Sequence, residues 1–105
     1  MTPPTAADSN FGLSPSTLGL LRGVLAHHTG INRAVVYGSR AKGAFRPGSD
    51  IDLTLDAPSL TLSDLLNIDR ELDDLMLPYT IDLSLLQHIN NPGLLSHIER
   101  VGKLL

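Results

Sequence analysis

A glycine–serine pair and two closely spaced aspartates are the residues of this chain best suited to chemistry. Gly38 and Ser39 follow a short apolar run, and Asp50 and Asp52 come after ten intervening residues. A tight Gly-Ser turn offers backbone N–H groups and a hydroxyl to phosphate oxygens. Two aspartates one residue apart on a strand point their carboxylates to the same side of a sheet, where they can share divalent cations. Phosphate binding beside a magnesium-type site is the minimum equipment for chemistry on a nucleotide.

A third carboxylate joins this pair if two predicted strands are neighbours. The segment Ile51-Asp52-Leu53 recurs as Ile81-Asp82-Leu83. If the two strands pair in register, Asp82 lies beside Asp50 and Asp52 on the open face of the sheet. Three clustered carboxylates repel one another strongly unless cations hold them together. A pair of magnesium ions is the usual remedy, and it is also the apparatus of in-line nucleotidyl transfer.

Apolar spacing predicts the elements that position these residues. Period-two alternation and β-branched residues predict strands over 33–37, 50–55 and 79–85. Helical spacing of apolar residues predicts helices over 14–30, 61–77 and 91–101. A short helical turn is expected over 39–43. We expect one α/β domain over residues 14–105, with three strands and the helices on one side of the sheet. Residues 1–13 are expected to be a flexible lead-in.

Composition narrows the class of protein. The chain has 105 residues, a formal charge of −3 and no cysteine, which excludes a disulfide framework and a thiolate zinc site. Its apolar runs are too short to span a membrane, and its basic residues do not favour nucleic acid as a direct partner. We expect a soluble cytoplasmic protein. Four basic residues near the Gly-Ser pair form a local positive patch suited to a small anion: Arg33, Arg40, Lys42 and Arg46.

The remaining polar residues are expected to have structural roles. Tyr37 reads as a strand packing residue, although it precedes the Gly-Ser turn and could touch a nucleotide. Ser49 is expected to cap the turn into the strand that carries the aspartates. The histidines, His97 included, show no zinc-ligand spacing and are not expected to bind metal.

The spacing from Gly38-Ser39 to Asp50-x-Asp52, with flanking strands, resembles the signature of the DNA polymerase β-like nucleotidyltransferase superfamily. The short length and the closing residues 100–105 resemble its smallest members, the minimal nucleotidyltransferases (MNT). The resemblance covers residues 14–105. It implies a small mixed three-stranded sheet with about four helices packed on it, ATP as substrate and two Mg²⁺ ions.

The resemblance also implies roles for individual residues. Gly38 and Ser39 would hold the β- and γ-phosphates, and Asp50 and Asp52 would bind both metal ions. The third carboxylate would bind the catalytic metal and help to activate the acceptor hydroxyl. Arg40 is added to the nucleotide-binding set because it is close to Ser39 in the sequence. The site residues are therefore Gly38, Ser39 and Arg40 for the nucleotide, and Asp50, Asp52 and Asp82 for metal binding and catalysis.

MNT proteins commonly act as antitoxins whose partner is a HEPN-domain ribonuclease. The resemblance therefore implies an antitoxin that transfers AMP from ATP to a tyrosine of a HEPN-type toxin (AMPylation) and disables it, in a hetero-oligomer. Larger relatives carry a further domain that presents the acceptor, and we expect none here, which suits a protein acceptor. Two alternatives stay open: nucleotidyl transfer to a small hydroxylated molecule, and a non-catalytic antitoxin that neutralises its partner by docking.

Overall fold

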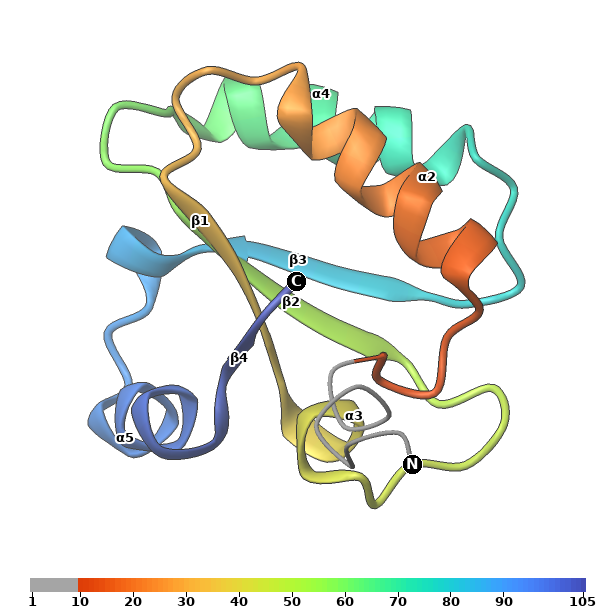
Figure 1. Cartoon of the computed structure of the whole chain (residues 1–105). Helices are drawn as coiled ribbons and strands as arrows, with labels where there is room; N and C mark the ends of the chain where they lie inside the picture. The colour runs from red at the N-terminus through yellow and green to blue at the C-terminus, as the bar shows by residue number, and fades with distance from the viewer. Residues whose placement is uncertain (1–9) are drawn as a thin grey trace.

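The sheet is the part of the fold that positions the candidate site. The computed structural model describes residues 10–105 (Figure 1). Its strands are β1 (Arg33–Tyr37), β2 (Ile51–Asp56), β3 (Ile81–Leu85) and β4 (Lys103–Leu104), in the spatial order β3-β2-β1-β4. β1 is antiparallel to both of its neighbours, whereas β2 and β3 run parallel. The predicted mixed α/β fold is confirmed, with one strand more than the three that we expected.

The additional strand is β4, at the edge of the sheet. It has two residues, and its Leu104 and Lys103 pair with Val35 and Val36 of β1. A strand of two residues is too short to show alternation, so the sequence pattern could not reveal it.

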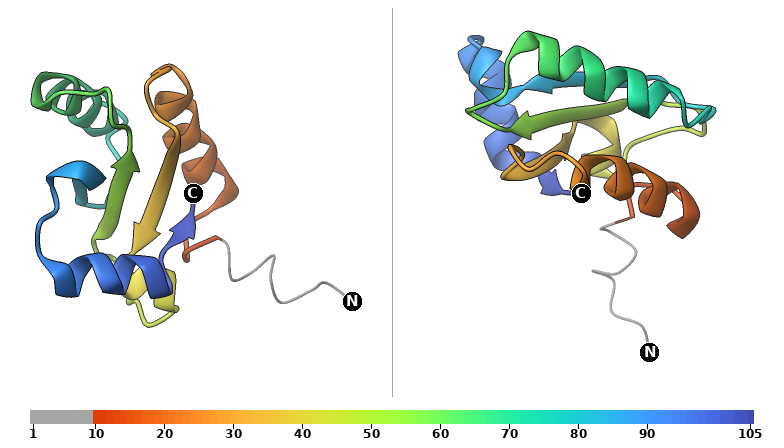
Figure 2. Two further views of the ribbon diagram at one scale, coloured as in Figure 1. Left: turned by 90° about the vertical axis from the view of Figure 1, so that its left-hand side faces the viewer. Right: turned by 90° about the horizontal axis from the view of Figure 1, so that it is seen from above.

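Two helices lie side by side over one face of the sheet, as Figures 1 and 2 show. They are α2 (Pro15–Ala26) and α4 (Leu62–Asp73). Each is preceded by the first residue of its predicted range, and the side chain of that residue caps the helix. The Ser14 hydroxyl accepts a hydrogen bond from the Thr17 N–H ahead of α2, and Thr61 and Asp64 form a reciprocal capping box at the start of α4. No helix within residues 10–105 is long and apolar enough to cross a bilayer.

The main core lies between these two helices and the sheet. β2 contributes the buried side chains of Ile51, Leu53 and Leu55, which alternate with the polar residues of the opposite face. Phe11 and Leu13, which we assigned to the lead-in, also lie in this core and are 1% and 3% exposed. The domain therefore begins before residue 14, and the rest of the predicted lead-in, residues 1–9, lies outside the described part of the chain.

The opposite face of the sheet is covered in part by α5 (Pro92–Val101), so the expectation that all helices lie on one side is wrong. Ile98 of α5 packs against Val35 and Tyr37, while the residue between them, Val36, faces the main core. β1 carries apolar side chains on both faces and needs cover on both. The remaining helical segments are α3 (Gly38–Lys42), directly after β1, and the 3-10 turn η1 (Leu86–His88), directly after β3.

Candidate active site

The Gly-Ser turn leads straight from β1 into α3 and lies against an aspartate of β2. Gly38 has a φ of +73°, which L side chains rarely adopt. A Cβ atom added to Gly38 would lie 2.2 Å from Oδ2 of Asp52, far closer than van der Waals contact allows. Glycine is therefore required here for two reasons, its backbone conformation and the approach of the carboxylate. The structure thus brings the first residue of the predicted phosphate turn against Asp52.

The carboxylates on β2 and β3 are neighbours, as the repeated Ile-Asp-Leu segment predicts. β2 and β3 pair in parallel with Asp52 opposite Asp82, so both side chains leave the same face of the sheet. Asp82 is exposed, on the edge strand, whereas Asp52 is partly buried. Asp50 is exposed and lies just before β2. The sheet thus holds two carboxylates side by side, with the third at the entrance to β2.

Burial is the main reason why the pKa of Asp52 is raised. The negative charges of Asp82 and Asp50 raise this pKa further, and His97 opposes them. Within residues 10–105, no group of three or more His, Asp or Glu side chains is arranged closely enough to hold a metal ion. Asp52, which faces Gly38, and the adjacent Asp82 nevertheless supply hard carboxylate oxygens in a negative environment, which fit Mg²⁺. Asp50, the third predicted carboxylate, is close enough for its charge to act on Asp52, but it does not form a ready three-carboxylate group with this pair.

Tyr37 forms part of the floor of the site. It pairs with Asp52 across β1 and β2 and is only 8% exposed. Burial raises the pKa of its phenol, a hydrogen bond with Ser84 of β3 opposes that shift, and the nearby Asp52 and Asp82 charges raise it further. Ser84 in turn donates to the Thr54 hydroxyl at 2.9 Å. Tyr37 therefore does more than pack within its strand, because the polar groups of β2 and β3 act on its phenol.

His97 of α5 reaches the site from the helix on this face. Its Nε2 accepts a hydrogen bond of 3.1 Å from the Gly38 N–H, and its ring meets the Tyr37 ring edge-on at 6.2 Å. We did not predict this contact. A signal for it exists, because His97 occupies the i+3 position of the stripe formed by Leu94, Ile98 and Val101, so it shares the inward face of the helix.

Arg40 has a different place from the one that we predicted. It is 2% exposed, and its guanidinium donates to the carbonyl oxygens of Ser49 and Phe11 at 2.9–3.0 Å. The same group lies over the rings of Phe45 and Tyr79, 5.1 and 4.8 Å from their centroids. These contacts join the loop before β2 to the first described residues. We therefore assign Arg40 a structural role and leave it out of the proposed nucleotide site.

The other basic residues of the expected positive patch are dispersed. Arg33 forms an ion pair with Asp56 at 2.9 Å, at the end of β1 that lies away from the Gly-Ser turn. Lys42 and Arg46 are exposed. The Ser49 hydroxyl accepts a hydrogen bond from the Arg46 N–H at 2.8 Å, which confirms its predicted role as a cap of the turn before β2.

The charge on Asp52 has a predictable effect on stability. Because its pKa is raised in the folded state, the fold binds this proton more tightly than the unfolded chain does. The stabilisation from protonation is present below the ordinary aspartate pKa of about 3.9 and is lost as the pH rises through the raised value. At neutral pH without divalent cations, Asp52→Asn should therefore stabilise the fold by about 1 kcal/mol, or roughly 4–8 °C in Tm.

Thermal unfolding in EDTA at pH 7 and at pH 4 measures this effect. We expect the gain from Asp52→Asn to shrink at the lower pH, where the wild-type carboxyl is closer to neutral. Asp69→Asn, at an exposed position of α4, is the control and should leave Tm unchanged. A lower Tm for Asp52→Asn than for the wild type at pH 7 would contradict the electrostatic account.

Comparisons with known proteins agree with this geometry. The sequence model of the family described as "Polymerase beta, Nucleotidyltransferase" matches residues 21–105. No curated protein matches the sequence. Among solved structures, the fold is similar to a crystal structure of a toxin–antitoxin with AMP-PNP, with a TM-score of 0.65, 21% identity, and coverage of 88% of this chain and 72% of that one.

Two mutant structures of the toxin–antitoxin MntA-HpeT are also similar. Both have a TM-score of 0.62, and their sequences are 19% and 22% identical to this one. The matches cover 85% and 86% of this chain, and each covers 68% of the MntA-HpeT chain that it matches. At these identities the structures show a shared fold. The family match spans most of the chain, including Gly38, Ser39 and all three aspartates. The chain belongs to the polymerase β nucleotidyltransferase family.

Proposed function

We propose that this protein is an antitoxin that transfers AMP from ATP to a partner toxin of the HEPN type and so neutralises it. The observation that carries the proposal is the convergence of Gly38, Asp52 and Asp82 from three different elements. A turn suited to phosphate and a pair of carboxylates suited to divalent cations meet at one place. Membership of the nucleotidyltransferase family supports the reaction class.

The residues divide into two sets. We assign Gly38 and Ser39 to the β- and γ-phosphates, through backbone N–H groups and the hydroxyl at the start of α3. We assign Asp50, Asp52 and Asp82 to two Mg²⁺ ions. When bound, these ions would neutralise charge on the triphosphate and lower the pKa of the acceptor hydroxyl. Burial raises the pKa of Asp52 most, and the charges of Asp82 and Asp50 raise it further; bound cations would offset those charges, which supports this assignment.

The proposed reaction is an in-line substitution at the α-phosphorus of ATP. An acceptor hydroxyl oxygen forms a new bond to that phosphorus while the bond to the bridging oxygen of the β-phosphate breaks, and pyrophosphate leaves. The hydroxyl proton passes to a nearby carboxylate. Asp82 is best placed for this proton because it is exposed on the edge strand, where an incoming acceptor can reach it.

A protein acceptor is favoured by the accessibility of this edge. Asp50 and Asp82 are both exposed, so a tyrosine carried on a partner surface could approach the pair Asp52 and Asp82 directly. Three similar solved structures are toxin–antitoxin structures, one of them with AMP-PNP, which supports a toxin as the partner and an adenine nucleotide as the donor.

Label transfer tests the proposal. The purified protein is incubated with Mg²⁺, ATP labelled at the α-phosphate and lysate of the source organism, in parallel with Asp52→Asn. We expect one labelled protein band with the wild type and none with the variant, and mass spectrometry of that band identifies the acceptor. A label that appears in a small molecule, or in nothing, would contradict protein AMPylation. Neutralisation of the partner by Asp52→Asn as well as by the wild type would contradict the catalytic account and indicate docking.

A further inference from the structure

The backbone amide of Gly38 already has an acceptor within the protein. Its N–H donates to Nε2 of His97 at 3.1 Å in a partly buried position. The imidazole also makes an edge-on contact with the ring of Tyr37. Tyr37 is buried, and it pairs with Asp52 across β1 and β2. A backbone amide has one hydrogen, so it cannot make a full hydrogen bond to His97 and to a phosphate oxygen at the same time.

We infer that His97 acts as a gate on the nucleotide site. In the free protein its imidazole occupies the Gly38 N–H, and it moves away from this N–H when a triphosphate binds. The inference rests on the proposed function, which assigns this amide to the phosphates. It adds that α5 regulates the site: any change in α5 that withdraws His97 makes ATP bind more tightly. Triphosphate and imidazole compete for one donor, so His97 lowers the affinity for ATP.

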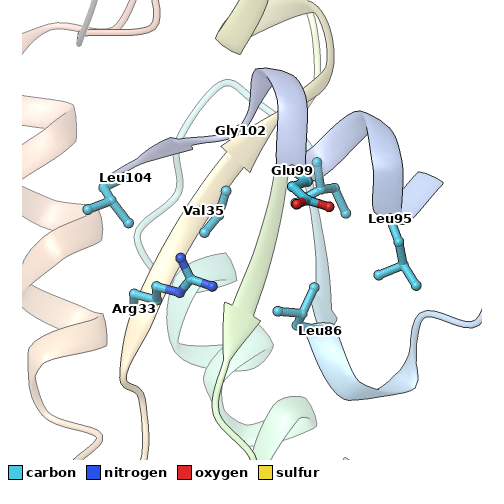
Figure 3. Close-up of a pocket in the computed structure, with 8 residues that line it drawn as sticks. Arg33, Val35, Leu86, Leu95, Glu99, Gly102 and Leu104 are labelled. Atoms are coloured by element: carbon cyan, nitrogen blue, oxygen red, sulfur yellow. The ribbon is translucent and has the colours of Figure 1, made fainter. Parts of the chain in front are cut away.

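The helix that carries His97 is only lightly anchored, which allows the gate to open. Within α5, all of which the structure describes, Ile98 is the one residue that counts as buried, and it is 7% exposed. It belongs to a small cluster with Val35 and Tyr37 that is separate from the main core. A cavity of about 440 Å³ lies beside this cluster, and Ile98 is one of its lining residues. Leu95 and Glu99 of α5 line it on one side, and β1 and β4 line it on the other (Figure 3). A rotation of the His97 side chain, or a small shift of α5, therefore disturbs few packed atoms.

Equilibrium binding to four proteins tests the gate. ATP and AMP, each with Mg²⁺, are titrated into the wild type, His97→Ala, His97→Leu and the control His88→Ala, whose histidine is exposed on η1. His97→Leu keeps most of the side-chain volume but has no acceptor, so it decides the outcome if His97→Ala does not fold. We expect both His97 variants to bind ATP about three- to tenfold more tightly, the change that the net worth of one hydrogen bond gives. AMP lacks the β- and γ-phosphates, so its affinity should not change.

Unchanged or weaker ATP binding by the His97 variants would overturn the inference, because it would show that the imidazole does not compete with the phosphates. The Gly38 amide resonance gives a second readout. It should shift on His97→Ala in the free protein and differ little between the two proteins once both are saturated with ATP. A Gly38 resonance that His97→Ala leaves unchanged would overturn the gate even if ATP binds well. Failure of all four proteins to bind ATP would instead refute the proposed function, and the gate with it.

Discussion

Asp52→Asn is expected to lower the rate of nucleotidyl transfer by about a hundredfold to a thousandfold, the usual cost of removing one group that stabilises charge in a transition state. Asp52 is the carboxylate on which the site is centred: it pairs in register with Asp82, faces Gly38 and has its pKa raised by burial and by its acidic neighbours. Asparagine keeps the shape of the side chain but supplies one neutral oxygen where a cation needs a negative one. The initial rate of label transfer from ATP to the acceptor measures the effect.

The control for this prediction is Asp69→Asn, which removes the same charge from an exposed position of α4. It should keep the wild-type rate, so that a loss in Asp52→Asn cannot be ascribed to net charge. The activity loss should accompany the gain in Tm predicted above. A variant that is both less stable and less active would indicate a folding defect, and a variant with the wild-type rate would remove Asp52 from the mechanism.

Gly38→Ala is expected to reduce transfer by about a hundredfold and to destabilise the fold by roughly 1–3 kcal/mol. The stability loss comes first from the φ of +73°, which alanine adopts only with strain. The rate loss comes from the new Cβ, which would lie 2.2 Å from Asp52 Oδ2 and must push the carboxylate away from its position. Label transfer and urea unfolding measure the two effects separately.

Gly43→Ala is a closely matched control for this variant. Gly43 has nearly the same φ, +75°, at the end of the same helix, but a Cβ there meets no atom within 4 Å. Both variants should therefore show the strain of the left-handed backbone, whereas only Gly38→Ala should lose activity. Equal activity in the two variants would mean that the contact between Gly38 and Asp52 does not matter for the reaction.

Much of the fold and the pairing of the carboxylates could be predicted from the sequence. The alternation in residues 51–55 and 81–85 separates one apolar face from one polar face, so the sequence predicts that Asp52 and Asp82 are neighbours if the two strands pair in register. The structure shows that they do. Gly38 is also identifiable, because the Gly-Ser pair follows an apolar strand and precedes the two aspartates with ten residues between. The structure adds the physical reason for glycine, a positive φ. These features follow from local periodicity and backbone chemistry.

Other features depend on contacts between distant segments and could not be predicted in this way. Proximity to Ser39 suggested that Arg40 binds a nucleotide, but the carbonyl oxygens of Phe11 and Ser49 enclose its guanidinium within the fold. The consecutive apolar residues within 33–37 are typical of a buried strand, but they do not indicate that α5 is the element that covers its second face. The contact of His97 with Gly38 could not be predicted for the same reason, since the two residues are 59 positions apart in the sequence and meet only through the packing of α5.

The central claim is nucleotidyl transfer at the site formed by Gly38, Asp52 and Asp82. It is tested most directly by following which phosphate of ATP is transferred to the acceptor. The purified acceptor, once identified, is incubated with the protein and with ATP labelled at either the α- or the γ-phosphate. We predict that the α-label enters the acceptor while the γ-label leaves in pyrophosphate, and that Asp52→Asn shows neither. Entry of the γ-label into the acceptor would indicate phosphoryl transfer and contradict the account, as would an acceptor that gains no label from either ATP.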